Sequence, residues 1–154
     1  MYNDVLYIVV DTNFILSRLK YKIDVLDEIN KIVVGRYKFV IPYLVFNELE
    51  GLSKNKGKYG VYAQTSLEWL REQIRKDKRM KNRKLRKIIE VKAKVKSEIS
   101  EINLDSWIIK YSTESLKKGK KIAVATNDKE LRKSLKKRCV KTFTIKGYKN
   151  IVYS

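Results

Sequence analysis

The sequence predicts a three-layer α/β/α fold in which a mainly parallel sheet lies between layers of helices. Two short apolar runs, Val5–Val10 and Ile122–Ala125, read as strands that are buried on both faces. Segments with strand character alternate with segments of helical spacing along the chain. The 154 residues, of which 44% are hydrophobic, can bury a sizeable core, so we expect a single domain over residues 1–154.

The expected strands and helices follow one another with recognisable ends. Gly35 and Gly119 are expected to end helices, and Pro42 is expected in the first turn of one. Expected strands cover residues 5–10, 37–41, 88–91, 122–125 and 140–145, and expected helices cover residues 12–20, 23–33, 42–52, 61–76, 104–118 and 128–137. Residues 53–60 are expected to form a basic loop, whereas residues 92–100 fit either a strand or a helix.

The chain is strongly basic, with 36 lysines and arginines against 17 acidic residues and a formal net charge of +19. Such a chain binds polyanions at low ionic strength, and nucleic acid is the expected partner. An anionic membrane surface is the rival partner. The sequence shows no strongly amphipathic basic helix with a broad aromatic face, so we expect no membrane binding.

The chain has no histidine and one cysteine, Cys139. These counts exclude Ser-His-Asp hydrolysis, Cys-His proteolysis, histidine-based cleavage of RNA and Cys/His zinc sites. Chemistry must then use carboxylates, hydroxyls, lysines or a metal held by oxygen. The single cysteine, a start without the basic segment of a signal peptide, and apolar runs too short to span a bilayer predict a cytoplasmic protein.

Two acidic residues stand at expected strand-to-helix junctions. Asp11 directly follows the first strand, and Asp128 follows the strand 122–125 after Thr126 and Asn127. Ligands of open parallel sheets bind beyond the carboxyl ends of the strands, where these two carboxylates can converge. Each residue taken alone is more often a helix N-cap, so both roles stay open.

Two further acidic residues are expected on helices that border the same edge. Glu48 falls within the expected apolar stripe of its helix, which comprises Leu44, Val45, Leu49 and Leu52. A carboxylate on such a stripe is costly unless it holds a metal, pairs with a lysine or reaches an edge. Asp105 begins the helix 104–118, where it can point toward the sheet edge or cap the helix.

Together, Asp11, Glu48, Asp105 and Asp128 would form a local negative cluster in a basic chain. Neighbouring carboxylates raise one another's pKa unless a cation neutralises them. Oxygen ligands suit Mg²⁺ or Mn²⁺, and such a metal can activate water and stabilise charge on a phosphodiester. The pattern therefore indicates a phosphodiesterase that acts on nucleic acid.

Four motifs resemble those of the PIN-domain nucleases and together cover nearly the whole chain. They are Val10–Leu16, Ile41–Leu52, Asn103–Ile108 and Ala125–Leu131, in the order and rough spacing of that family. The likeness is greatest to the archaeal group related to the endonuclease that processes small-subunit ribosomal RNA precursors. The toxins of toxin–antitoxin pairs share the same core.

The resemblance implies a PIN-like fold, one or two Mg²⁺ or Mn²⁺ ions, and endonucleolytic cleavage that leaves a 5′-phosphate and a 3′-hydroxyl. The metal ligands and catalytic residues implied by the matched motifs are Asp11, Glu48, Asp105 and Asp128. Supporting hydrogen bonds are implied for Thr12, Asn13, Thr126 and Asn127. The implied function is metal-dependent endoribonuclease activity in rRNA or other RNA processing, and a homodimer is implied by the family alone.

Two features depart from the family pattern. Leu104 stands where this group often has a second acid beside Asp105, which would thin the metal shell or leave one tight site. Residues 78–100 form a basic insertion whose role is open. Contacts with RNA are expected from Lys54, Lys56, Lys58, Lys129 and Arg132. Tyr59 and Tyr62 can stack on bases, whereas Trp69 and Trp107 are expected in the core.

Three other functions stay open. The chain can be a toxin-type ribonuclease, which a neighbouring antitoxin gene would favour. It can be a non-catalytic RNA-binding module in ribosome assembly, although the presence of all four acids argues against loss of cleavage. It can also be a DNA nuclease of the related flap type, although it lacks the extra length that such enzymes use to clamp DNA.

Overall fold

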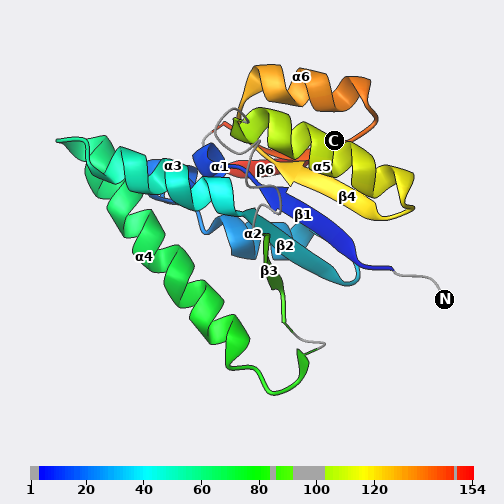
Figure 1. Ribbon diagram of the computed structural model, residues 1–154, viewed down its shortest axis with the longest axis horizontal. Coiled ribbons are helices and arrows are strands. Elements are labelled where there is room, and N and C mark those ends of the chain that lie inside the picture. Colours follow the sequence, from blue (N-terminus) through cyan, green and yellow to red (C-terminus); the bar gives the residue numbers. More distant parts are fainter. Residues whose placement is uncertain (1–3, 84–85, 92–102, 148) are drawn as a thin grey trace, which may run out of the picture.

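A six-stranded sheet forms the centre of the protein (Figure 1). The computed structural model describes residues 4–83, 86–91, 103–147 and 149–154. The strands are β1 (Leu6–Val10), β2 (Tyr37–Pro42), β3 (Ile88–Val91), β4 (Lys121–Ala125), β5 (Lys141–Lys146) and β6 (Asn150–Tyr153). Their order across the sheet is β3-β2-β1-β4-β5-β6, and all neighbours are parallel except β5 and β6.

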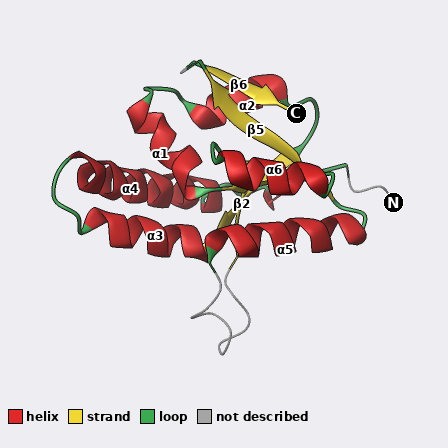
Figure 2. Cartoon of the chain, turned by 90° about the horizontal axis from the view of Figure 1, so that it is seen from above, coloured by secondary structure: helices red, strands yellow, loops and turns green. Residues whose placement is uncertain are grey.

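Helices cover both faces of this sheet. They are α1 (Thr12–Lys20), α2 (Val25–Ile32), α3 (Tyr43–Ser53), α4 (Lys58–Lys78), α5 (Leu104–Lys117) and α6 (Lys129–Lys137). Seen from above, α3 and α5 lie along one side of the sheet, and α1 and α2 lie on the other (Figure 2). Helix α4 packs against α3 and α1. The predicted three-layer fold with a mainly parallel sheet is confirmed.

The central strands are buried on both faces, as their sequences predict. Ile8, Val9 and Val10 of β1 are at most 2% exposed, and Ala123 to Ala125 of β4 are fully buried. Strand β1 pairs with β2 on one side and with β4 on the other. The chain adds β2 and β3 on one side of β1 and then returns to add β4 on the other side, so the order of strands switches between β1 and β4. Such a switch point is where open α/β sheets bind their ligands.

Three expectations about the elements were wrong in detail. Pro42 is the last residue of β2 and the N-cap of α3, with an extended ψ of 139°, so it precedes the first helical turn. Helix α4 begins at Lys58 because Gly57 turns the chain with a φ of 96°, so the basic loop shortens to residues 54–57. Strand β6 was not expected. It pairs antiparallel with β5 after a turn at Gly147, where φ is 61°.

Other expectations concern residues that are only partly described. The choice between strand and helix for residues 92–100 lies outside the described residues, as does much of the expected basic insertion 78–100. Trp69 and Trp107 pack against the core, but both stay partly exposed. Among the described residues, no helix combines the length and the apolar composition that crossing a bilayer requires.

Candidate active site

Backbone hydrogen bonds join the end of β1 to β4 and the end of β4 to β5, beside the switch point. The Asp11 N–H donates to the Ala125 carbonyl over 3.0 Å, and the Thr126 N–H donates to the Phe143 carbonyl over 3.0 Å. Asp11 and Asp128 are the N-caps of α1 and α6. Because β1 and β4 are parallel and in register from Leu6 to Val10, both junctions lie at the same edge of the sheet.

Asp11 is buried, with 4% of its surface exposed, and it is held by neutral donors. Its Oδ1 accepts the backbone N–H of Thr12 over 2.8 Å. Its Oδ2 accepts the hydroxyl of Thr126 over 2.7 Å and the side-chain amide of Asn13 over 3.1 Å. Since a carboxylate offers about four acceptor positions, Asp11 keeps room for a further partner.

Burial and neighbouring negative charge make Asp11 a weak acid for its type. The pKa of Asp11 is raised from 3.8 to about 6, and burial is the largest cause. The charges of Asp105 and Glu48 contribute to this rise, whereas the hydrogen bonds from Thr126 and Thr12 oppose it. Asp105 and Glu48 are therefore close enough to Asp11 for their charges to contribute to its raised pKa.

Asp105 is exposed on the first turn of α5, but it does not cap that helix. The N-cap is Asn103, whose Oδ1 accepts the Ser106 N–H over 2.8 Å. Burial raises the pKa of Asp105, and the charges of Asp128 and Glu48 add to the effect. The Asp105 carboxylate is therefore not used to cap the helix, and the charges of Asp128 and Glu48 bear on it.

Glu48 does not lie on the buried stripe of α3, so this part of the sequence prediction was wrong. The buried residues of α3 are Val45 and Leu49, and Glu48 is exposed. With 3.6 residues per turn, a helix face centred on Val45 and Leu49 leaves Glu48 on its flank. The residue still acts electrostatically on Asp11 and Asp105, whereas Glu50 pairs with Arg71 on α4 at 3.2 Å.

Asp128 is half-buried and shares one hydroxyl with Asp11. Its Oδ1 accepts the Leu131 N–H over 3.0 Å, which caps α6. The Asp128 N–H donates to the Thr126 Oγ1 over 3.1 Å, and that hydroxyl donates to Asp11. In the described part of the chain, the Asp128 Oδ2 accepts no hydrogen bond, which leaves it open to a ligand.

A second network of hydrogen bonds joins the segment after β1 to the segment after β4. The Asn127 N–H donates to the Asn13 Oδ1 over 3.0 Å, and the Asn127 side-chain amide donates to the Ser17 hydroxyl. The Ser17 hydroxyl donates to the Asn13 carbonyl over 2.7 Å. Sequence reasoning missed Ser17, because a serine on a buried helix face carries no signal of its partner until the strands pair.

The oxygen atoms at this edge of the sheet are of the kind that binds a hard divalent cation, although the carboxylates do not surround one point. Among the described residues, no three acidic, histidine or cysteine side chains lie close enough together to hold a metal ion. Within the same residues, none of the four acids forms an ion pair with a lysine or arginine. The buried hydroxyl of Thr12, beside Asp11, has no hydrogen-bond partner. Carboxylates without a counter-ion and a buried hydroxyl without a partner are donors of the kind that Mg²⁺ or Mn²⁺ prefers.

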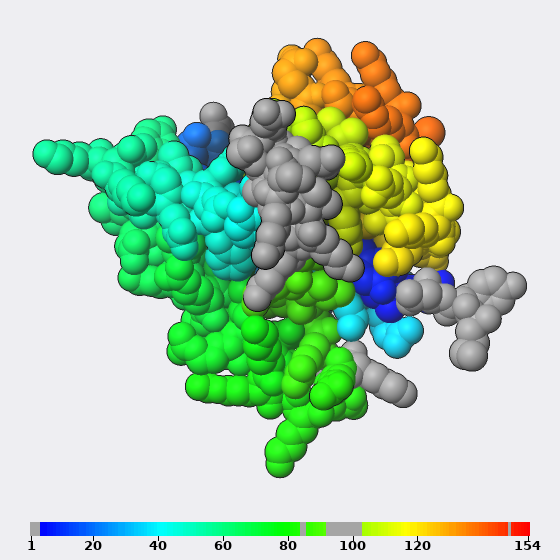
Figure 3. All heavy atoms as spheres, in the orientation of Figure 1, coloured from blue at the N-terminus to red at the C-terminus, as the bar shows by residue number. Residues whose placement is uncertain are grey.

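Basic residues follow two of the acids along the chain, after Glu48 and after Asp128. Lys54, Lys56 and Lys58 are exposed where α3 passes into α4, a region that projects at the left of the molecule (Figure 3). Lys129 is exposed next to Asp128. Arg132 is half-buried one turn later, and its Nε has no hydrogen-bond partner. Of the predicted RNA contacts, Lys129 is therefore adjacent to Asp128 in the chain, whereas the three lysines lie beyond the end of α3, the helix that carries Glu48.

Comparison with known proteins agrees with this architecture. The family model described as the PIN domain matches residues 8–146. The solved structure of the PIN domain endonuclease Utp24 aligns with a TM-score of 0.64 at 20% identity, covering 94% of this chain and 90% of the other. A domain of a functionally unknown protein from Methanocaldococcus jannaschii DSM 2661 aligns with a TM-score of 0.58 at 18% identity, covering 92% and 91%.

These structural likenesses support the fold, and the family match carries the assignment. No curated protein matches the chain in a sequence comparison. The matched segment spans β1 to the end of β5, so it includes Asp11, Glu48, Asp105 and Asp128. The chain belongs to the PIN domain family of nucleases.

Proposed function

We propose that the protein is a metal-dependent endoribonuclease that hydrolyses RNA phosphodiesters in rRNA or other RNA processing. The observation that supports this most is that the buried Asp11 feels the negative charges of Asp105 and Glu48, and Asp105 those of Asp128 and Glu48, while none of the four acids pairs with a cation among the described residues. Burial and mutual repulsion raise the pKa of Asp11 to about 6. A divalent cation would relieve this repulsion.

The four acidic side chains differ in how firmly hydrogen bonds hold them in place. Asp11 and Asp128 are fixed by caps and by the Thr126 hydroxyl, so they would define the position of the ion. Asp105 and Glu48 are exposed and can turn their side chains toward it. A cation held there would supply the charge that activates water and offsets negative charge on the phosphate. One or two Mg²⁺ or Mn²⁺ ions fit this donor set.

RNA is the proposed substrate because the chain is strongly basic and exposes an aromatic ring next to lysines. The net charge of +19 favours a polyanion. Tyr59 is 64% exposed on the first turn of α4, beside the three lysines of the α3–α4 junction. Its ring lies edge-on to Tyr62 with a centroid distance of 6.5 Å. Exposed rings beside lysines suit single-stranded RNA, whose bases stack on aromatic side chains.

The test is cleavage of single-stranded RNA with Mn²⁺ by the unaltered protein and by Asp11→Asn/Asp128→Asn. We expect a loss of at least roughly a hundredfold in the double variant, because several kcal/mol of charge stabilisation depend on these ligands. The matched control, Glu50→Gln/Glu130→Gln, removes two exposed carboxylates of α3 and α6 that are not proposed ligands and should keep full activity. Equal cleavage by all three proteins would assign the activity to another site or to a contaminant.

A non-catalytic RNA-binding module is the second candidate, and one observation favours it. In the described residues the carboxylates do not converge on a single point. RNA binding without cleavage of any tested RNA, in Mg²⁺ and in Mn²⁺, would support this candidate over the nuclease.

A further inference from the structure

A cavity of about 420 Å³ lies at the end of the sheet opposite to the four acids. Its lining includes Tyr7 of β1, Tyr37 and Lys38 of β2, and Lys87 just before β3, so it lies where these strands begin. Asp11, in contrast, follows the last residue of β1. None of the four acids lines the cavity, which is therefore separate from the candidate active site.

The charge around this cavity has one sign. Among the described residues that line it, four are basic and none is acidic. The basic ones are Arg36, Lys38, Arg86 and Lys87. Val5 and Val33 add apolar surface to the walls. A cleft that has apolar walls and charges of one sign concentrates the electric field and attracts ions of the opposite charge, so this cavity favours an anion.

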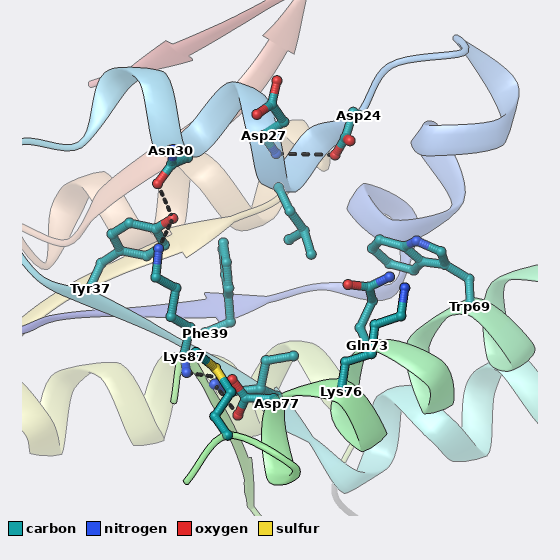
Figure 4. Close-up of a pocket in the computed structure, with 13 residues that line it drawn as sticks. Asp24, Asp27, Asn30, Tyr37, Phe39, Trp69, Gln73, Lys76, Asp77 and Lys87 are labelled. Atoms are coloured by element: carbon teal, nitrogen blue, oxygen red, sulfur yellow. Dashed lines mark hydrogen bonds between the residues drawn. The ribbon is translucent and has the colours of Figure 1, made fainter. Parts of the chain in front are cut away.

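A neighbouring cavity between α2 and α4, drawn in Figure 4, differs in charge although it shares Asn30, Tyr37 and Lys87. Of its described lining residues, three are aspartates and two are lysines, so that lining is net negative. The Tyr37 hydroxyl donates to the Asn30 Oδ1 over 2.6 Å and accepts the Lys87 Nζ over 3.2 Å (Figure 4). An anion is therefore expected beside Arg36 and Lys38, and not between α2 and α4.

The backbone of the basic residues is anchored to the sheet. The Arg36 carbonyl accepts the N–H of the first residue of β1 over 3.0 Å, and Lys38 stands in register with Tyr7 across the β1–β2 pair. The Lys87 N–H donates to the Asp77 Oδ1 over 2.7 Å. Because the backbone at these positions is already ordered, binding a ligand there costs less conformational entropy than binding at a loose loop.

Arg36 and Lys38 are available to a ligand. Within the described residues, their side chains form no hydrogen bond and no ion pair. The charge of Arg36 lowers the pKa of Asp4, but Asp4 itself pairs with Lys121 at 2.8 Å. The Arg86 guanidinium donates to two backbone carbonyls at and just after the end of α4, over 2.8 and 3.3 Å. An arginine has five N–H donors, so Arg86 keeps others for a ligand.

We propose that this cavity binds a phosphate group and that Arg36 and Lys38 hold it. Arginine matches two phosphate oxygens with parallel N–H groups, and lysine adds a point charge. The favoured source is an RNA strand, because Arg86 connects the cavity to the exposed basic residues that follow α4. Those residues include Arg79, Lys81 and Arg83. The site needs neither the four acids nor a metal, so it goes beyond the proposed cleavage.

The test compares two variants in the presence of a chelator, which removes metal-dependent binding at the four acids. Arg36→Gln/Lys38→Gln removes the two available cationic groups of the cavity. Lys137→Gln/Arg138→Gln removes the same charge at the exposed end of α6 and is the control. Calorimetric titration with inorganic pyrophosphate measures the binding of phosphate alone. Filter binding of a single-stranded RNA oligonucleotide measures the binding of the strand.

We expect Arg36→Gln/Lys38→Gln to weaken the binding of both probes by about tenfold, because the loss of one hydrogen bond to a charged group has about this effect. The control should leave both affinities unchanged. Weaker binding of pyrophosphate alone would support the site and identify a free phosphate compound as its ligand. Weaker binding of RNA alone would support the site and identify the strand as its ligand.

Two results would overturn the proposal. One is that neither probe binds, and the other is that Arg36→Gln/Lys38→Gln weakens binding no more than the control does. Circular dichroism checks that the variants fold. If the double variant does not fold, Arg36→Gln alone, which changes no strand residue, takes its place. Cleavage of RNA by the unaltered protein with Mn²⁺ is measured separately, so a failure here leaves the proposed nuclease standing.

Discussion

The hydroxyl of Thr126 donates a hydrogen bond of 2.7 Å to the carboxylate of Asp11, although the two residues are 115 positions apart in the chain. The same hydroxyl accepts the N–H of Asp128 over 3.1 Å. Thr126 is fully buried, so water does not compete for these bonds. One hydroxyl thus holds two of the proposed ligands in a fixed relationship across the switch point.

Thr126→Val removes this hydroxyl and keeps the shape of the side chain. We expect metal affinity and cleavage to fall by roughly 10- to 100-fold, as when other groups that orient metal ligands are lost. The pKa of Asp11 should rise further, because the Thr126 hydrogen bond lowers it. Calorimetric titration with Mn²⁺ measures the affinity. Thr113→Val, which removes a hydroxyl bonded only within α5, is the control.

The raised pKa of Asp11 predicts a pH dependence of stability in the metal-free protein. The folded protein keeps the Asp11 proton up to about pH 6, whereas an unfolded chain loses it near the ordinary aspartate pKa of 3.8. Ionising the buried Asp11 therefore lowers the free energy of unfolding as the pH rises between these two pKa values. Above the higher value this loss of stability stays constant. This shift corresponds to about 3 kcal/mol.

Asp11→Asn should lack this contribution. Denaturant unfolding with a chelator, at several values between pH 4 and 7, gives the free energy of unfolding of both proteins. The difference between the two curves should change by about 3 kcal/mol across this range, with the unaltered protein losing stability as the pH rises. Parallel curves would contradict the assignment. Glu130→Gln, at an exposed position, should follow the unaltered protein.

Divalent cations should stabilise the protein more at pH 7.5 than at pH 5. A proton on Asp11, whose pKa is raised to about 6, competes with the ion at the lower pH. Mn²⁺ at about 100 times its Kd should stabilise the folded state by about 2.7 kcal/mol. Thermal unfolding with and without Mn²⁺ measures the effect. A rise in Tm that persists in Asp11→Asn/Asp128→Asn would point to a different ion site.

The lysines at the α3–α4 junction should carry part of the RNA affinity. Replacing Lys54, Lys56 and Lys58 by glutamine should lower the slope of log K against log salt by about 2, at about 0.7 for each lost contact with a single strand. Filter binding over a salt series gives the slope. The matched control replaces Lys117, Lys118 and Lys120, which are equally exposed at the far end of α5. A similar loss in the control would indicate diffuse attraction by the whole surface.

Local signals predicted the positions of Asp11 and Asp128. Each follows a continuous apolar strand and begins a helix, and both features can be recognised from a few neighbouring residues. The alternative of a simple N-cap proved compatible with a ligand role, because each cap uses only Oδ1. Capping and ligand binding compete only when they need the same lone pairs.

The predictions for the other two acids depended on packing that the sequence does not state. Glu48 was placed on a buried stripe because Leu44 and Leu52 flank it, but α3 buries the face of Val45 and Leu49. Asp105 was a candidate cap, and Asn103 takes that role. Which side of an apolar arc faces the core, and where a helix begins, depend on the neighbouring elements.

The sequence alone determined the basic charge, the alternation of strands and helices, the absence of histidine chemistry, and the junctions that carry Asp11 and Asp128. These features depend on composition or on residues close in the chain. Only the tertiary structure decided that Thr126 bonds to Asp11, that Ser17 bonds to Asn127, and that a cavity opens between α2 and α4. Such contacts form when distant segments pack together, and no local pattern encodes which donor will meet which acceptor.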